Sequence, residues 1–272
     1  MKITNKHNLP EALYNVIART REPTENRISV TELIDAPLIR KLKIIHWDSL
    51  EEDASDRLWS LLGQSVHYAL EQGSPPDALA EERLEVNLGK ITLSGQADLY
   101  KDGEITDWKT TSVFSYLLGG KVQWERQLNL YGFLYKQTGF PVTSLKVHAI
   151  LRDWVKGRSL REEDYPPIPF VTVNIPVWSD EEVQAYIGDR MVRHFDLPAE
   201  RCTDEERWYK GTTFAVKKKG QKRARRVLNT MQEAEAWIGE EKGLIIEERK
   251  GADVRCENYC LVRNVCPYME GE

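Results

Sequence analysis

The chain has 272 residues, of which 41% are hydrophobic and 30% charged, and its formal net charge is −5 at neutral pH. This composition is that of a folded globular protein, and no apolar run approaches the length of a membrane span. The acidic balance argues against a protein that binds nucleic acid over its whole surface. The first twenty residues lack a signal-peptide pattern, so we expect a cytoplasmic protein.

Helices are predicted from apolar repeats and from capping residues. Leu58, Leu62, Val66 and Leu70 recur every fourth residue, which predicts a long helix with one apolar stripe. A Ser or Thr followed three residues later by Glu marks helix starts at Ser29, Ser179 and Thr230. The expected helices cover residues 10–19, 29 to before Pro37, 56–72, 122–137, 179–195 and 231–241.

Strands are predicted by runs of β-branched and aromatic residues, at 83–87, 90–100, 104–110, 144–154 and 170–178. Asp102-Gly103 is a strong signal for a two-residue hairpin turn. The resulting register pairs Lys101 with Glu104, Tyr100 with Ile105, Asp98 with Asp107, and Gln96 with Lys109. A mixed sheet flanked by helices is the economical architecture for this order of elements.

The hairpin places two carboxylates, Asp98 and Asp107, opposite each other. Like charges at directly paired positions are destabilising unless a cation lies near them. Lys109 shares a face with Asp107 and supplies one positive charge. A divalent cation such as Mg²⁺, which binds one or two protein carboxylates, would supply more. The alternative is a surface hairpin whose Asp and Lys side chains are solvated.

Four short patterns occur in order around this hairpin. They are G-x-x-x-H at Gly63 and His67, G-x-x-D at Gly95 and Asp98, D-x-K at Asp107 and Lys109, and Q-x-x-x-Y at Gln127 and Tyr131. Together they resemble the PD-(D/E)XK nuclease superfamily, and most of all its RecB-like exonucleases, including CRISPR-associated and phage members. Residues 29–33 are a weaker match to a further S-x-T-x-L pattern. The resemblance implies a mixed α/β restriction-endonuclease-like core at 1–200, with a basic, cysteine-containing region at 201–272 packed on it.

The resemblance also implies a Mg²⁺- or Mn²⁺-dependent deoxyribonuclease. Its metal ligands would be His67, Asp98, Asp107 and the main-chain carbonyl of Trp108. Lys109 would orient the attacking water and stabilise developing negative charge. Gln127 and Tyr131 would lie along the cleft and steady the metal site or the DNA. Taken alone, a single histidine on a helix, such as His67, is more often a structural residue. Glu85, on the strand before the hairpin, is a further candidate acidic residue of the cleft.

A basic block lies in the last quarter of the chain. Its cations are Lys217, Lys218, Lys219, Lys222, Arg223, Arg225 and Arg226. Such a block is either a solvated loop or a phosphate-contacting surface. Trp208, Phe214 and Trp237 lie nearby in the sequence, and basic residues among aromatic ones suit single-stranded DNA; the alternative is that the aromatic residues belong to a core.

The four cysteines, Cys202, Cys256, Cys260 and Cys266, all follow residue 200. Without a secretion signal, such clustering favours metal ligation over disulfides. The residues alone leave open an iron–sulfur cluster, zinc, or unliganded thiols. The resemblance favours a [4Fe-4S] cluster, although this chain has Ala36-Pro37 where the family usually has a Cys-Pro, and its first cysteine spacing is one residue wider.

The expected function is therefore a metal-dependent exonuclease acting on linear DNA, single- or double-stranded, in recombination, repair or phage DNA processing. A helicase or recombinase is a candidate partner, and the setting would be a bacterial or virus-infected cell. Two alternatives stay open: a nuclease-like DNA-binding adaptor without catalysis, and an endonuclease with the same active site. The complete Asp98, Asp107 and Lys109 set argues against the adaptor.

Overall fold

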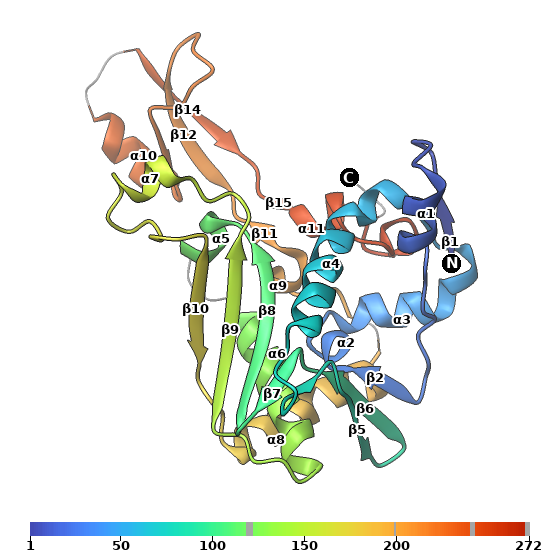
Figure 1. The fold of residues 1–272 in the computed structure, drawn as a ribbon. Helices are drawn as coiled ribbons and strands as arrows, with labels where there is room; N and C mark the ends of the chain where they lie inside the picture. Colours follow the sequence, from blue (N-terminus) through green and yellow to red (C-terminus); the bar gives the residue numbers. More distant parts are fainter. Residues whose placement is uncertain (118–121, 199, 240–242, 270–272) are drawn as a thin grey trace. The chain divides into compact units, whose positions relative to one another are not determined.

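The computed structural model describes residues 1–117, 122–198, 200–239 and 243–269. The chain forms two compact units, Met1–Ala199 and Glu200–Glu272 (Figure 1). Within the residues described, no helix has both the length and the apolar character needed to cross a membrane.

The first unit is built on a five-stranded sheet. Its strand order is β10 (Phe170–Ile175), β9 (Ser144–Leu151), β8 (Glu104–Thr111), β7 (Leu99–Lys101) and β4 (Leu79–Ala80). Strands β8 and β9 are parallel, and the other neighbours are antiparallel. The mixed α/β fold expected from the sequence is thereby confirmed.

Smaller sheets adjoin it in the same unit. A three-stranded sheet has the order β2 (Arg27–Ser29), β6 (Ile91–Gln96) and β5 (Arg83–Leu88). Strands β1 (Lys2–Thr4) and β3 (Glu51–Asp53) form a parallel pair. The helices are α1 (Glu11–Ile17), α2 (Val30–Ile34), α3 (Pro37–His46), α4 (Leu58–Gln72), α5 (Val113–Leu117), α6 (Val122–Gln137), α7 (Lys156–Ser159) and α8 (Asp180–Met191).

The capping residues act as expected. Ser29 and Ser179 each form a complete capping box with a Glu three residues later. Pro37 does limit α2, but it also begins α3, which the sequence reasoning missed. Proline is favoured at the first helical position because its fixed φ suits the helix and its missing N–H would have no partner there.

The hairpin turn is confirmed, whereas the single long strand before it is wrong. Asp102 and Gly103 have φ of +48° and +84°, and Tyr100 pairs with Ile105. The strand expected at 90–100 is interrupted after Gln96, which pairs with Arg83 and not with Lys109. The strand is interrupted here because β6 belongs to the three-stranded sheet, whereas β7 belongs to the five-stranded sheet.

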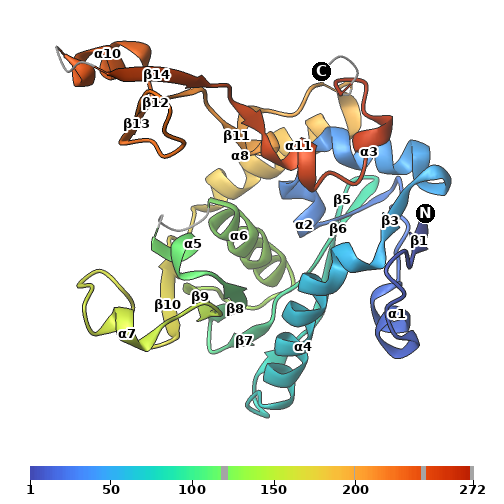
Figure 2. The same ribbon diagram turned by 90° about the horizontal axis from the view of Figure 1, so that it is seen from above.

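Helix α6 provides the centre of the core. Its predicted apolar face, Trp124, Leu128, Tyr131 and Tyr135, is buried. The ring of Tyr135 stacks on Tyr100 of β7, with ring centroids 4.7 Å apart. The helix therefore packs against the strands that carry the hairpin, and Figure 2 shows α6 and α4 on either side of β7 and β8.

Helix α4 is packed on one side only. None of its residues is fully buried, and Leu62 is 40% exposed, so its predicted apolar stripe is not a core stripe. Among the described residues, the helix lies against β8 and also contacts α1. Helix α4 therefore lies at the surface of the first unit, and its side chains are at least partly accessible to solvent.

The second unit has its own small sheet, β13 (Arg226–Leu228), β12 (Thr213–Lys218) and β14 (Leu244–Arg249), with α10 (Met231–Ile238) packed on it. The end predicted for this helix, at residue 241, lies outside the described residues. Short elements complete the unit: α9 (Asp204–Arg207), β11 (Tyr209–Lys210), β15 (Ala252–Asp253) and α11 (Val254–Asn258). Arg207 ties two of them together by donating to both carboxylate oxygens of Asp253.

Candidate active site

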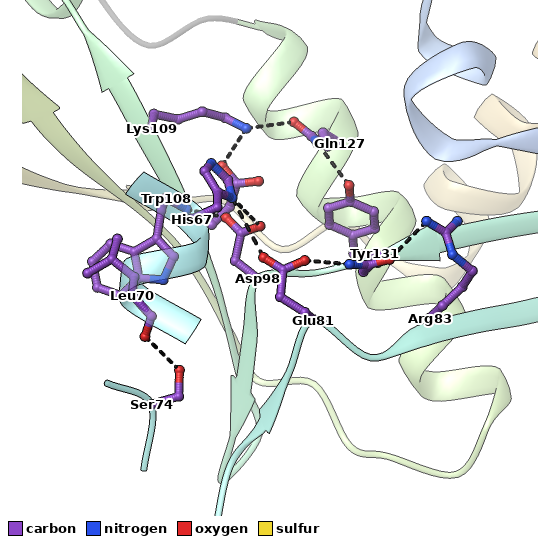
Figure 3. Close-up of polar contacts among 12 residues, drawn as sticks. His67, Leu70, Ser74, Glu81, Arg83, Asp98, Trp108, Lys109, Gln127 and Tyr131 are labelled. Atoms are coloured by element: carbon purple, nitrogen blue, oxygen red, sulfur yellow. Dashed lines mark hydrogen bonds and ion pairs between the residues drawn. The ribbon is translucent and has the colours of Figure 1, made fainter. Parts of the chain in front are cut away.

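The site lies where the chain passes from β6 to β7. Asp98 occupies this break and is almost fully buried. Its Oδ2 accepts a hydrogen bond from the main-chain N–H of Trp108 on β8, at 2.5 Å. Its Oδ1 lies 3.0 Å from Nδ1 of His67 on α4 (Figure 3). The break therefore directs Asp98 at two elements, the partner strand of the hairpin and helix α4, which lies further away in the sequence.

Glu81 is a functional candidate that the sequence reasoning missed. Its Oε1 lies 3.7 Å from Nδ1 of His67, and its main-chain N–H donates to the carbonyl of Asp98 at 3.2 Å. Gln96 donates to its Oε2 at 2.5 Å, and Arg83 in turn donates to Gln96 at 2.8 Å (Figure 3). Glu81 is thus held at the site by Gln96, which is paired with Arg83 at one end of the β5–β6 ladder.

Nothing in the pattern of the sequence distinguished Glu81. It lies between β4 and β5 after a Pro-rich linker, where acidic residues are usually solvated, and its φ is +52°, a conformation rare for residues other than glycine. Glu85, which the sequence offered as an additional acidic residue of the cleft, is exposed on β5 and forms an ion pair with Arg27. The structure therefore does not bring Glu85 into this group.

Asp107 and Lys109 lie on the face of β8 that is turned toward α6. Asp107 is only 2% exposed, and its Oδ2 lies 2.6 Å from the ammonium of Lys109. Burial raises the pKa of Asp107 to about 6; Lys109 opposes this rise, whereas Asp98 adds to it. The negative charge of Asp98 therefore acts on Asp107, as expected for two carboxylates that lie near each other.

A hydrogen-bonded chain holds Lys109 in position. Its ammonium donates to Oε1 of Gln127 at 3.2 Å, and the amide of Gln127 donates to the hydroxyl of Tyr131 at 2.9 Å. Gln127 and Tyr131 are one turn apart on α6, so their side chains share one face (Figure 3). The Q-x-x-x-Y pattern thus connects the lysine to the core helix.

Glycine at position 95 allows α6 to approach the site. A Cβ atom built there would lie 2.6 Å from Cδ1 of Leu134 and 2.9 Å from the ring of Tyr131, closer than real Cβ contacts. The first residue of the G-x-x-D pattern therefore has a packing role. It lets the helix that carries Gln127 and Tyr131 cross the strand that leads to Asp98.

Several ionisable groups of the site have raised pKa values. The hydrogen bond to Asp98 is the main cause that raises the pKa of His67, and burial raises the pKa of Glu81. Burial also raises the pKa of the Tyr131 hydroxyl, and the negative charge of Asp107 adds to this rise. Protons are therefore held more tightly here than in water, as expected where carboxylates crowd together.

The residues present fit a divalent cation. One ligand atom each from His67, Glu81 and Asp98 lies within 4.8 Å of the others, and this is the one such group of three or more in the parts of the chain that the structure describes. Carboxylate and imidazole ligands suit Mg²⁺ or Mn²⁺. Asp107 lies beside the group and faces Lys109. The carbonyl of Trp108 stays a predicted ligand, since the contact seen is made by its N–H.

The four cysteines are half-buried and form no disulfide. Burial raises the pKa of Cys202 to about 12, and the proximity of Cys256 and Cys260 contributes. Burial also raises the pKa of Cys256, and the nearby Cys260 and Cys266 add to this rise. The fold of the second unit therefore gathers the distant Cys202 with the C-terminal three.

The basic block forms the end of the β12–β13 hairpin, here called the basic hairpin (residues 217–226). Lys217 is largely buried and forms an ion pair with Glu247. The six basic residues that follow it are exposed: Lys218, Lys219, Lys222, Arg223, Arg225 and Arg226. Of the nearby aromatic residues, Trp208 and Trp237 are each at least 40% exposed.

Comparisons with known proteins show the family to which the chain belongs. The chain matches the PD-(D/E)XK nuclease superfamily over residues 5–267. A comparison with curated proteins found no match. Among solved structures, SSO0001 aligns with a TM-score of 0.52 and 15% identity, covering 95% of this chain and 93% of that one. At this identity the similarity shows a shared fold.

Two further structures align less closely. The alkaline exonuclease LHK-Exo from Laribacter hongkongensis has a TM-score of 0.41 and 8% identity, covering 68% of this chain and 92% of that one. A phage-related exonuclease from Haemophilus somnus 129PT has a TM-score of 0.30 and 18% identity, covering 47% and 62%.

Proposed function

Because the chain belongs to the PD-(D/E)XK nuclease superfamily, we propose that it is a Mg²⁺- or Mn²⁺-dependent deoxyribonuclease that digests linear DNA from its ends. One observation carries the proposal. The cation-binding group of His67, Glu81 and Asp98 lies beside a buried Asp107–Lys109 pair. A complete acidic and basic set of this kind favours catalysis over a purely DNA-binding role.

His67, Glu81, Asp98 and Asp107 would hold the metal ion. When bound, a divalent cation supplies neutralisation of the charge on the scissile phosphate. Because the pKa of His67 and that of Glu81 are raised, protons compete with the ion for these ligands. Binding of the ion should therefore strengthen as pH rises through the titration of these groups.

Lys109 would act on the water and the phosphate. Its ammonium is fixed between Asp107 and Gln127 at 2.6 and 3.2 Å, so it cannot swing freely into solvent. A fixed ammonium can orient an attacking water and stabilise negative charge that develops on the phosphate oxygens. Gln127 and Tyr131 position Lys109 and have no chemical step of their own in this proposal.

The cysteines would hold a [4Fe-4S] cluster that fastens the C-terminal tail to the segment around Cys202. The support for the cluster is the resemblance of the sequence motifs to RecB-like nucleases, many of which carry one. Four cysteines could also hold a zinc ion, which is the alternative. Protein purified without oxygen should then be brown. If the protein is colourless and contains zinc, the cysteines form a zinc site and the cluster proposal is wrong.

DNA ends are proposed as substrate because the motifs resemble RecB-like exonucleases, and the pathway would be recombination, repair or phage DNA processing. The basic hairpin supports a nucleic-acid substrate by its charge. An endonuclease with the same site is the second candidate. It differs in its products, because it would cut closed circles and release discrete fragments.

The test is digestion of end-labelled linear DNA, single- and double-stranded, beside a closed circle, with Mg²⁺, Mn²⁺ or EDTA. We expect metal-dependent loss of linear DNA only. The variant Lys109→Met, which keeps the length of the side chain, should lower the rate by at least about a hundredfold.

A matched control is Lys146→Met. Lys146 lies on the adjacent strand β9 and forms an ion pair with Glu104 at 2.5 Å, but it is outside the site. Its rate should equal that of the native protein. Cleavage of the circle would make the protein an endonuclease, and DNA binding without any cleavage by folded, metal-loaded protein would favour the adaptor.

A further inference from the structure

Trp59 is exposed on the helix that carries His67 of the candidate active site. It is the second residue of α4, the helix that carries His67, and 71% of it is accessible to solvent. A single exposed apolar residue is common on protein surfaces and needs no explanation by itself. Two features of its surroundings give this one a specific meaning.

The first feature is a cation stacked on the indole. The guanidinium carbon of Arg152 lies 5.0 Å from the centroid of the Trp59 ring. Arg152 directly follows β9, and its main-chain N–H donates to the carbonyl of Thr111, the last residue of β8, at 3.0 Å. The pair is thus attached to the end of the strand that carries Asp107 and Lys109.

The second feature is an open strip between Trp59 and His67. Trp59, Gly63 and His67 are spaced four residues apart, so they follow one side of α4 over about 12 Å. A Cβ atom at Gly63 would meet nothing within 4 Å. Within the part of the chain that the structure describes, the surface at Gly63, midway between the indole and the imidazole, is therefore uncrowded.

We propose that Trp59 and Arg152 form a stacking platform for an unpaired nucleobase of the substrate, with the sugar–phosphate chain passing Gly63 to reach the site. The inference rests on the proposed function. An indole provides a face for any base, and the arginine adds a charge for the neighbouring phosphate. Stacking of this kind is tolerant of sequence, as end-directed digestion requires.

The experiment compares two ligands on four proteins at one fixed salt concentration. The ligands are a fluorescein-labelled single-stranded oligonucleotide and an oligonucleotide of equal length made of abasic nucleotides. The proteins are native, Trp59→Ala, Trp59→Phe and Tyr68→Ala, in EDTA to prevent cleavage. Tyr68 is a matched control because it is also exposed, at 66%, and lies about two and a half turns further along α4, on the opposite side.

We expect Trp59→Ala to weaken binding of the normal oligonucleotide roughly 5- to 150-fold. Binding of the abasic ligand should not change, because it has no base to stack. Trp59→Phe should restore most of the affinity, and Tyr68→Ala should bind as the native protein does. A merely structural role of Trp59 would instead affect both ligands equally, and that result would overturn the inference.

Failure of the inference and failure of the function give different results. If the native protein digests DNA while Trp59→Ala binds and digests as well as it does, the platform is wrong and the nuclease assignment stands. If the native protein neither binds nor digests DNA, the proposed function is wrong and the platform is removed with it.

Discussion

At the scale of single residues, the site depends on three carboxylates with different environments. Asp98 is fixed by Trp108 and His67, Asp107 is buried against Lys109, and Glu81 is held by Gln96. Each is therefore positioned by contacts within the protein itself. Such preorganisation lowers the conformational cost of binding a cation, which would otherwise have to order its ligands.

The first prediction concerns Glu81. Glu81→Gln keeps the shape of the side chain but removes a negative charge from the cation-binding group. We expect the affinity for Mn²⁺, measured by isothermal titration calorimetry, to fall at least about tenfold. The neutral amide also removes one site of competing protonation, because burial raises the pKa of the Glu81 carboxyl.

Glu85→Gln is the control for this measurement. It makes the same chemical change on the adjoining strand β5, where the carboxylate pairs with Arg27 outside the group. Its Mn²⁺ affinity should match that of the native protein. Equal affinities for all three proteins would show that Glu81 is not a ligand.

The residues that sequence could and could not identify differ in a physical way. The two-residue turn predicted the pairs from Tyr100–Ile105 to Lys101–Glu104, because local backbone geometry determines pairing in a hairpin. The pair expected between Asp98 and Asp107 is not part of this ladder, which ends at Leu99 and Thr106. Glu81 reaches the site through a main-chain contact to Asp98 and a positive φ. Both depend on tertiary packing, so no local pattern indicates them.

At the scale of elements, the relation between α6 and the strands determines the site geometry. The helix was predicted over 122–137 and its buried face was correct, since apolar periodicity reports a helix packed against a core. The exchange of partners between β6 and β7 was missed. Both pieces have strand-forming residues, and only the sheets around them decide where each one pairs.

The second prediction tests the close approach at Gly95. In Gly95→Ala, the new methyl group would overlap Leu134 and Tyr131, so α6 or the strand must move. We expect the free energy of unfolding, measured with urea, to fall by about 1–3 kcal/mol. Nuclease activity should fall further than stability alone explains, because Tyr131 supports the Gln127–Lys109 contact.

Gly63→Ala is the matched substitution at an uncrowded glycine. Its methyl group would meet nothing within 4 Å, and the residue is inside helix α4. Alanine favours the helix, so the free energy of unfolding should rise by about 0.5–1 kcal/mol. Opposite signs for the two substitutions are expected; a stable Gly95→Ala protein would mean that Leu134 and Tyr131 can yield without loss.

At the scale of the whole molecule, one short stretch is strongly basic in an otherwise acidic chain. The chain has a net charge of −5 although seven cations lie within residues 217–226. The rest of the chain therefore has a net charge of −5 − 7 = −12 and is more acidic than the total suggests. An arrangement of this kind directs a polyanion to one part of the surface, without the general affinity of a basic protein.

The third prediction measures how much of the DNA affinity comes from the basic hairpin. Lys219 and Lys222 are exposed at its turn, whereas Lys217 is neutralised by Glu247. Each phosphate contact releases counterions and adds about 0.7 to 0.9 to the slope of log affinity against log salt. Replacing Lys219 and Lys222 with Ala should therefore reduce that slope by about 1.4 to 1.8.

The comparison needs a variant with the same loss of charge elsewhere. Lys2 and Lys90 are exposed on the first unit, so their double replacement with Ala changes the net charge equally. If only total charge mattered, both double variants would shift the affinity alike, with little change in slope. A reduced slope confined to the hairpin variant would assign the phosphate contacts to residues 217–226, and an unchanged slope would exclude Lys219 and Lys222 from them.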